Sequence, residues 1–156
     1  IDLIDDIPVG ALQTSIGFTS YHLDAGNDPL FPFGYGLSYT TFDYSDVVLS
    51  QDELIAGGVL KASCQITNSG NTAGYEVVQC YVRDKVASLA RPVKELKGFQ
   101  KIYLNPGETK SVEFVLNPDD LAFWHEDMTL RTEPGEFQVW IAKDSDSGTP
   151  VSFQYK

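Results

Sequence analysis

The chain has 156 residues, of which 42% are hydrophobic and 21% are charged. This size and composition are typical of one globular domain and exclude a disordered chain. The formal net charge of −11 repels phosphate groups and anionic lipids, so we expect neither a nucleic acid nor a membrane as partner. The first residues lack an initiating Met and the basic start and apolar core of a signal peptide, so we expect a piece of a longer protein.

Residues 1–41 are rich in Pro, Gly and Asp and have weak periodicity, which predicts an irregular N-terminal extension. Its last part, DPLFPFGYGLSYTTF (Asp28–Phe42), is crowded with aromatic rings between prolines and glycines. The prolines hold the chain extended, and the glycines allow backbone angles that other residues avoid. Rings in such a segment are expected to pack against something.

Residues 42–156 consist of short alternating segments between turn signals, which is typical of β-strands. The expected strands are Phe42–Ser50, Val59–Thr67, Tyr75–Asp84, an extended stretch Arg91–Leu104 interrupted at Gly98, Thr109–Leu116, Glu136–Lys143 and a final edge strand Val151–Tyr155. Turns are expected at 68–71, 105–108 and 133–137, and a short helical turn at 117–121 with Asn117 as its cap.

This pattern predicts an all-β fold, an antiparallel β-sandwich of the immunoglobulin or fibronectin type III kind, with under about 10% helix. The alternation also predicts which side chains fill the core: Leu60, Cys64, Ile66, Val78, Cys80, Val82, Val112, Phe114, Leu116, Phe137, Val139 and Ile141. Both cysteines stand at core positions, where a free thiol serves as a small hydrophobic side chain. We therefore predict two buried thiols, with a disulfide as the alternative.

Candidates for catalysis or metal binding are weak, and we expect no catalytic residue, cofactor or metal. His22 and His125 stand in no nucleophile motif, which favours structural roles. Asp144–Gly148 imitates the start of a calcium loop, but Tyr155 occupies the position of the required bidentate Glu. The neighbouring acids Asp119–Asp120 and Glu126–Asp127 lie near turns, where adjacent side chains point apart, so neither forms a glycosidase pair.

Two aromatic residues of the expected sandwich are candidate platforms for sugar rings. Alternation places Trp140 on the face opposite the core residues of its own strand, and Tyr103 lies near the end of the extended stretch Arg91–Leu104. An exposed ring there can stack on a sugar, whereas a loop or another domain can equally cover it. For Trp140 we favour cover.

Three stretches, PLFPFGYGLSYTTF, RPVKELKGFQKIYLNPGET and EPGEFQVWIA, resemble the C-terminal region of glycoside hydrolase family 3, the β-glucosidases and related exo-acting enzymes. AGYEVVQCYVRD resembles a central strand of that region's fibronectin type III-like domain. The resemblance implies that residues 42–156 are this domain and that residues 1–41 are a linker and the tail of a preceding α/β sandwich domain. It also implies that the catalytic residues lie in other domains of a parent enzyme, which hydrolyses terminal β-D-glucosyl residues.

By this resemblance the partners are the catalytic domains of the parent, on which Phe31, Phe33, Tyr35 and Tyr39 would dock. The alternative is that these rings fold back onto the sandwich. A carbohydrate-binding domain of the same enzyme is the second functional hypothesis, and a generic adhesion domain is the third. The resemblance favours a periplasmic or secreted location over the cytoplasm, and the sugar preference of the parent is set elsewhere.

Overall fold

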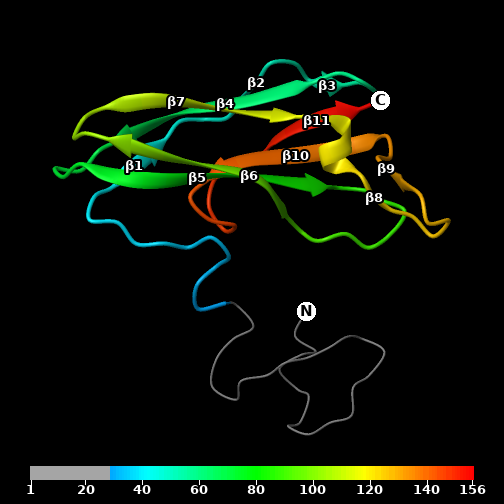
Figure 1. Cartoon of the computed structure of the whole chain (residues 1–156), viewed down its shortest axis with the longest axis horizontal. Coiled ribbons are helices and arrows are strands. Elements are labelled where there is room, and N and C mark those ends of the chain that lie inside the picture. Colours follow the sequence, from blue (N-terminus) through cyan, green and yellow to red (C-terminus); the bar gives the residue numbers. More distant parts are fainter. Residues whose placement is uncertain (1–28) are drawn as a thin grey trace, which may run out of the picture. The chain divides into compact units, whose positions relative to one another are not determined.

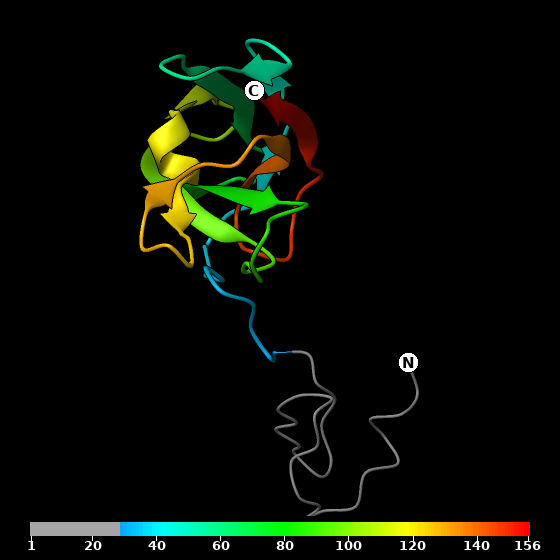
Figure 2. The same ribbon diagram turned by 90° about the vertical axis from the view of Figure 1, so that its right-hand side faces the viewer.

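The computed structural model describes residues 29–156, and the larger compact unit of the chain is Pro32–Lys156. This unit is a two-layer β-sandwich, seen from the side in Figure 1 and along its strands in Figure 2. Among the described residues the only helix is η1, a single 3-10 turn at Pro118–Leu121. No helix in this part of the chain is long and apolar enough to cross a membrane. The predicted all-β sandwich is confirmed.

The first layer is a four-stranded antiparallel sheet built around β4. Strand β7 pairs with β4 along nearly its whole length, while β1 and β2 pair with the two ends of β4 in succession. The strands are β1 (Phe42–Tyr44), β2 (Val48–Leu49), β4 (Leu60–Asn68) and β7 (Thr109–Leu116).

The single strand predicted at Phe42–Ser50 is therefore two short strands. The interruption falls at Ser45, whose side-chain oxygen accepts the backbone N–H of Gln65 at 2.9 Å. A side chain thus replaces a backbone carbonyl in the ladder, and the chain leaves the regular strand path there.

The second layer is a five-stranded sheet in the order β3-β11-β10-β5-β6. Its strands are β3 (Glu53–Leu54), β5 (Gly74–Asp84), β6 (Glu95–Leu104), β10 (Gly135–Ala142) and β11 (Val151–Tyr155). A bulge at Lys97 adds one residue to β6, because Cys80 pairs with Gly98 whereas Tyr81 pairs with Leu96. A separate hairpin joins β8 (Phe123–Trp124) to β9 (Leu130–Arg131).

The prediction that Val151–Tyr155 is an edge strand was wrong. Strand β11 lies between β10 and the short strand β3, which pairs with it in parallel through Gln154–Glu53 and Tyr155–Leu54. A strand of two residues is too short to show an alternating pattern, so the sequence gives no signal that β3 pairs with the edge of β11.

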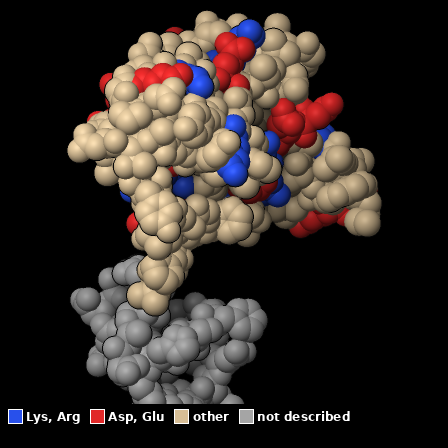
Figure 3. Space-filling view, turned by 60° about the vertical axis from the view of Figure 1, so that its left-hand side comes forward, with Lys and Arg blue, Asp and Glu red and all other residues tan. Residues whose placement is uncertain are grey.

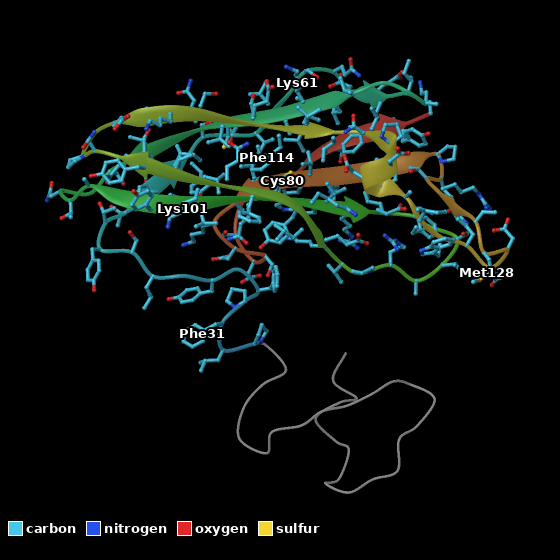
Figure 4. All side chains as sticks on the ribbon, in the orientation of Figure 1. Phe31, Lys61, Cys80, Lys101, Phe114 and Met128 are labelled. Carbon is cyan, nitrogen blue, oxygen red and sulfur yellow. The ribbon has the colours of Figure 1, made fainter. Side chains whose placement is uncertain are left out.

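The core lies between the two layers and contains every predicted core residue, each at most 8% exposed. Figure 4 shows Cys80 and Phe114 in this interior. Gly98 belongs to the same packing, since a Cβ there would lie 3.3 Å from the Phe114 ring. The predicted interruption at Gly98 is thus a close approach between sheets rather than the end of a strand.

The strands of the second layer also define an outer face, which positions the site described next. On β5, Val78, Cys80 and Val82 point inward, so the intervening residues point away from the core. We call the outward side of β5, β6 and β10 the outer face.

Candidate functional site: the strap and the outer face

Residues 32–41 form a segment, here called the strap, that runs along the second layer before β1. It is the blue-to-cyan stretch nearest the sandwich in Figures 1 and 2. A turn opens the strap, closed by a hydrogen bond from the N–H of Tyr35 to the carbonyl of Pro32 at 3.1 Å. The third residue of this turn is Gly34, with φ +82°. Such an angle is typical of the third position of a type II turn, which favours glycine.

The turn is held on the outer face by two side chains of β5. Gln79 donates from Nε2 to the Gly34 carbonyl at 3.0 Å and to the Lys143 carbonyl at 2.5 Å. The Tyr81 hydroxyl oxygen lies 3.3 Å from the Phe33 carbonyl oxygen, and this carbonyl accepts the N–H of Ser145 at 2.9 Å. The strap is therefore bonded to both β5 and the loop after β10.

Close packing at this anchor leaves no room for a side chain at Gly34. A Cβ at that position would lie 2.1 Å from Gln79 Oε1 and 2.6 Å from the Tyr81 hydroxyl. Both atoms belong to one buried pair, because the Tyr81 hydroxyl donates to Gln79 Oε1 at 2.5 Å. Glycine is thus required twice, by the positive φ and by the contact.

The other end of the strap is fixed by Asn68, which is fully buried. Its Oδ1 accepts the Thr40 hydroxyl at 2.7 Å and the Gly70 N–H at 3.1 Å. Its Nδ2 donates to the carbonyls of Thr72 and Leu104. This one side chain therefore joins the strap to β4 and to the end of β6.

Between these anchors the strap presents apolar side chains to solvent. Phe33 is 66% exposed, Leu37 is 90% exposed and Tyr39 is completely exposed. Two other predicted docking residues, Phe31 and Tyr35, are 60% and 44% exposed. Within the strap, the backbone is thus bonded to the sheet while the side chains of Phe33, Leu37 and Tyr39 are largely exposed. Leu37 was not among the predicted docking residues, because a single leucine between glycine and serine has no distinguishing pattern.

A hollow of about 390 Å³ lies between the strap and the sheet. It is lined by strap residues together with Tyr75, Glu76, Val77 and Lys143. Glu76 accepts the Tyr44 hydroxyl at 2.6 Å. Burial raises the pKa of the Glu76 carboxyl, against the opposing effects of the Tyr44 hydrogen bond and the Lys143 charge.

Trp140 lies on the outer face, as alternation predicts, but is only 5% exposed. The Lys94 ammonium lies 4.4 Å from the centre of the ring. Lys94 also donates to the Ser145 carbonyl at 2.6 Å, which keeps its side chain in place. The Trp140 ring is therefore covered, as favoured from the sequence, and it presents no open face to a sugar.

Tyr103, the other candidate platform, is 43% exposed and contacts Tyr75. The two ring centres lie 4.9 Å apart and the ring planes are inclined at 60°. The Lys101 ammonium stands over the Tyr75 ring at 4.6 Å. Two coplanar rings would suit a sugar chain, whereas these rings are tilted and one face is occupied by a cation.

The remaining predicted candidates have local structural roles, except His22, which lies outside the described residues. His125 is buried, stacks on Phe123 and has its Nδ1 3.4 Å from a Glu133 oxygen. Asp144 is also buried and accepts the N–H of Asp146 at 3.1 Å, which closes a turn. Asp120 accepts the N–H of Asn117 at 2.7 Å, so the cap predicted at Asn117 is built from this carboxylate.

Cys64 and Cys80 are both buried and free, as predicted. Burial raises the pKa of the Cys64 thiol to about 11 and that of the Cys80 thiol to about 12. Both thiols are therefore uncharged at neutral pH and act as apolar core groups.

Comparison with known proteins agrees with this geometry. Residues 76–145 match the family described as "Fibronectin type III-like domain". This segment is therefore similar to fibronectin type III-like domains. It is 48% identical over 137 residues to a periplasmic β-glucosidase of Salmonella typhimurium, covering 88% of this chain and 18% of that protein. It is likewise 48% identical over 117 residues to a β-xylosidase of Formosa agariphila, covering 75% of this chain and 16% of the relative.

The solved β-glucosidase of Listeria innocua superimposes with a TM-score of 0.81 at 36% identity, over 94% of this chain and 21% of the solved one. The chain thus spans about a fifth of the length of the relatives it matches. The predicted resemblance to the C-terminal domain of glycoside hydrolase family 3 enzymes is confirmed. In these relatives the matching segment is one part of a larger enzyme chain.

Proposed function

We propose that this fibronectin type III-like domain is a non-catalytic accessory domain of a family 3 β-glucosidase. In this proposal it docks on the catalytic domains of the parent through the strap and stabilises them. The relatives support it because the matching segment belongs to much longer enzymes, named β-glucosidase or β-xylosidase.

The observation that carries the proposal is the contrast between the two sides of the strap. Its backbone and small residues are bonded to the sandwich through Gly34 and Thr40, while Phe33, Leu37 and Tyr39 remain at least 66% exposed. A segment that is bonded to one domain on one side and exposes apolar side chains on the other is suited to join two domains. Burying each large side chain contributes roughly 1.5–3 kcal/mol, enough for three of them to fix the pose of the domain.

One carboxylate from each of the acidic pairs Asp119–Asp120 and Glu126–Asp127 supports the non-catalytic part of the proposal. Asp120 accepts a backbone N–H, and Asp127 accepts bonds from Thr129 and Arg131. These groups hold turns together. The 156-residue chain should accordingly release no p-nitrophenol above a blank from p-nitrophenyl β-glucoside or β-xyloside, and release above the blank would overturn this part.

The docking part is tested in the full-length enzyme by replacing Phe33, Leu37 and Tyr39 together with Ala. We expect the melting temperature of the catalytic part to fall by roughly 2–4 °C or more, with KM for p-nitrophenyl β-glucoside unchanged. The matched control replaces three exposed apolar residues elsewhere, Val48, Ile55 and Val59, with Ala. If both triple variants melt like the parent, the strap does not dock.

A further inference from the structure

The basic side chains fall into two groups. The chain has eleven Lys and Arg residues, and all of them lie within the described range. Seven have a carboxylate oxygen within 4.0 Å: Lys61, Lys85, Arg91, Lys97, Lys110, Arg131 and Lys156. The other four have no such partner among residues 29–156: Arg83, Lys94, Lys101 and Lys143.

These four cations gather on one side of the sandwich. Lys101 lies opposite Val77, and Arg83 lies opposite Gln138, in both cases on the outer face. Lys94 stands over the Trp140 ring of that face, and Lys143 lines the hollow beneath the strap. Figure 4 shows Lys101 and the paired Lys61 on opposite sides of the molecule.

The same face carries a band of exposed apolar side chains. Tyr75 and Tyr103 pair across β5 and β6, and Val77 follows on the same side. Phe99, opposite Gln79, is 67% exposed. Figure 3 shows basic side chains at several points on one face of the molecule, some of them beside acidic side chains. The chain has a net charge of −11. Even so, the four cations without a carboxylate oxygen within 4.0 Å lie together beside this apolar band.

The band is continuous with the strap. Tyr75 and Val77 line the hollow together with Leu37 and Tyr35 of the strap. One partner that covers the strap would therefore reach this band as well.

We propose that the outer face binds an apolar and acidic surface of the catalytic part of the same polypeptide, whose carboxylates pair with Lys101 and Arg83. This inference rests on the proposed function and adds a second contact, with a stated chemistry, to the docking strap. Charge complementarity selects the partner, because Lys101 and Arg83 have no carboxylate oxygen within 4.0 Å among residues 29–156, while the chain as a whole is acidic. A sugar is disfavoured by the inclination of Tyr75 to Tyr103 and by the Lys101 ammonium over the Tyr75 ring.

The test uses single variants of the full-length enzyme. Phe99→Ser removes apolar contact from the outer face, and its matched control is Val115→Ser on β7, where Val115 is 49% exposed in the other sheet. We expect Phe99→Ser to lower the melting temperature of the catalytic part by a few degrees and Val115→Ser to lower it by less than about 1 °C. Equal shifts for the two variants would overturn the proposal.

Lys101→Glu tests the charge. We expect a decrease in melting temperature that shrinks as salt rises from 0.05 to about 1 M, because screening weakens repulsion between carboxylates. The decrease for Phe99→Ser should not shrink with salt. The same Lys101→Glu change in the 156-residue chain controls for effects within the sandwich. A decrease of equal size there would overturn the interdomain contact.

Results for the strap and for the outer face can be told apart. If the strap variant destabilises the enzyme while Phe99→Ser and Lys101→Glu do not, the outer-face contact is wrong and the proposed function stands. If the outer-face variants act and the strap variant does not, the domain docks through the sheet alone. If Phe99→Ser instead abolishes retention on insoluble β-glucan with no change in melting temperature, the face is a sugar site and the proposal fails.

Discussion

The two outward sides of this sandwich follow the same alternation but differ in how their side chains are satisfied. On the four-stranded sheet, Lys61 pairs with Glu113 at 2.9 Å and Thr67 bonds Thr109 at 2.8 Å, each between neighbouring strands. On the five-stranded sheet, Lys101 has no carboxylate within reach among the described residues, and Phe99 is mostly exposed. A side whose groups pair with each other suits water, whereas a side with unmatched groups suits a partner.

Gly34→Ala should have the largest effect, because it acts where the strap meets the outer face. The new Cβ would meet Gln79 and the Tyr81 hydroxyl at a residue with φ +82°. We expect a loss of roughly 1–3 kcal/mol in the free energy of unfolding of the 156-residue chain, measured by urea denaturation. Faster proteolysis of the strap should accompany it.

The matched control is Gly36→Ala, since a Cβ at Gly36 would have nothing within 4 Å. That variant should stay within about 0.5 kcal/mol of the parent chain. Equal losses for both glycine variants would mean that the strap is not fixed through Gly34, and the contrast between a bonded and an exposed side of the strap would be lost.

Glu76→Gln should have an intermediate effect that depends on pH. Because burial raises the pKa of Glu76 in the folded chain, the folded state binds its proton more tightly than the unfolded state does. The contribution of Glu76 is therefore most favourable below the ordinary carboxyl pKa and is lost as pH rises through the raised value. Gln keeps an acceptor for Tyr44 and removes the charge, so the variant should be more stable than the parent at pH 7.

Melting curves of the two chains from pH 3 to pH 8 measure this difference. The gain of the variant should vanish toward the acid end of the range. A gain that is constant with pH would assign it to packing, and a variant less stable at pH 7 would mean that Lys143 outweighs burial at this carboxyl.

Lys61→Ala should have the smallest effect, because its pair with Glu113 is about half exposed on both sides. Exposed pairs contribute about 0–1 kcal/mol, so urea denaturation of the 156-residue chain should show a loss within that range. A loss above about 1.5 kcal/mol would show that the paired side depends on its ion pairs, and the contrast between the two sides would need another explanation.

The core of the fold could be predicted because alternation is a property of each strand alone. Cys64 and Val112 are neighbours in the structure, yet each was placed inward from its own segment. The short strand β3 and the identity of the group that covers Trp140 could not be predicted, because both depend on residues far away in the sequence. For Trp140 the covering group is Lys94, from the loop before β6.

The same limit applies to the candidate site. The glycines and rings of the strap indicated an unusual segment, but its anchors gave no signal. Gln79 stands at an outward position of a strand, and Asn68 stands in a predicted turn, so both amides were expected to face solvent. The division of the cations into those with and those without a carboxylate partner could not be predicted from the sequence either. It depends on the register of strands such as β4 and β7, which places Lys61 beside Glu113 across 52 residues of chain.

The two buried cysteines allow the separation of the two layers to be followed by chemical labelling. Cys64 belongs to β4 in one layer and Cys80 to β5 in the other, and both thiols are buried and uncharged at neutral pH. Since the thiolate is the reactive form, an alkylating reagent can modify either one only when its layer separates from the opposite one. Labelling rates at the two sites, read by mass spectrometry, therefore measure how often the two layers open around each thiol, without any added probe.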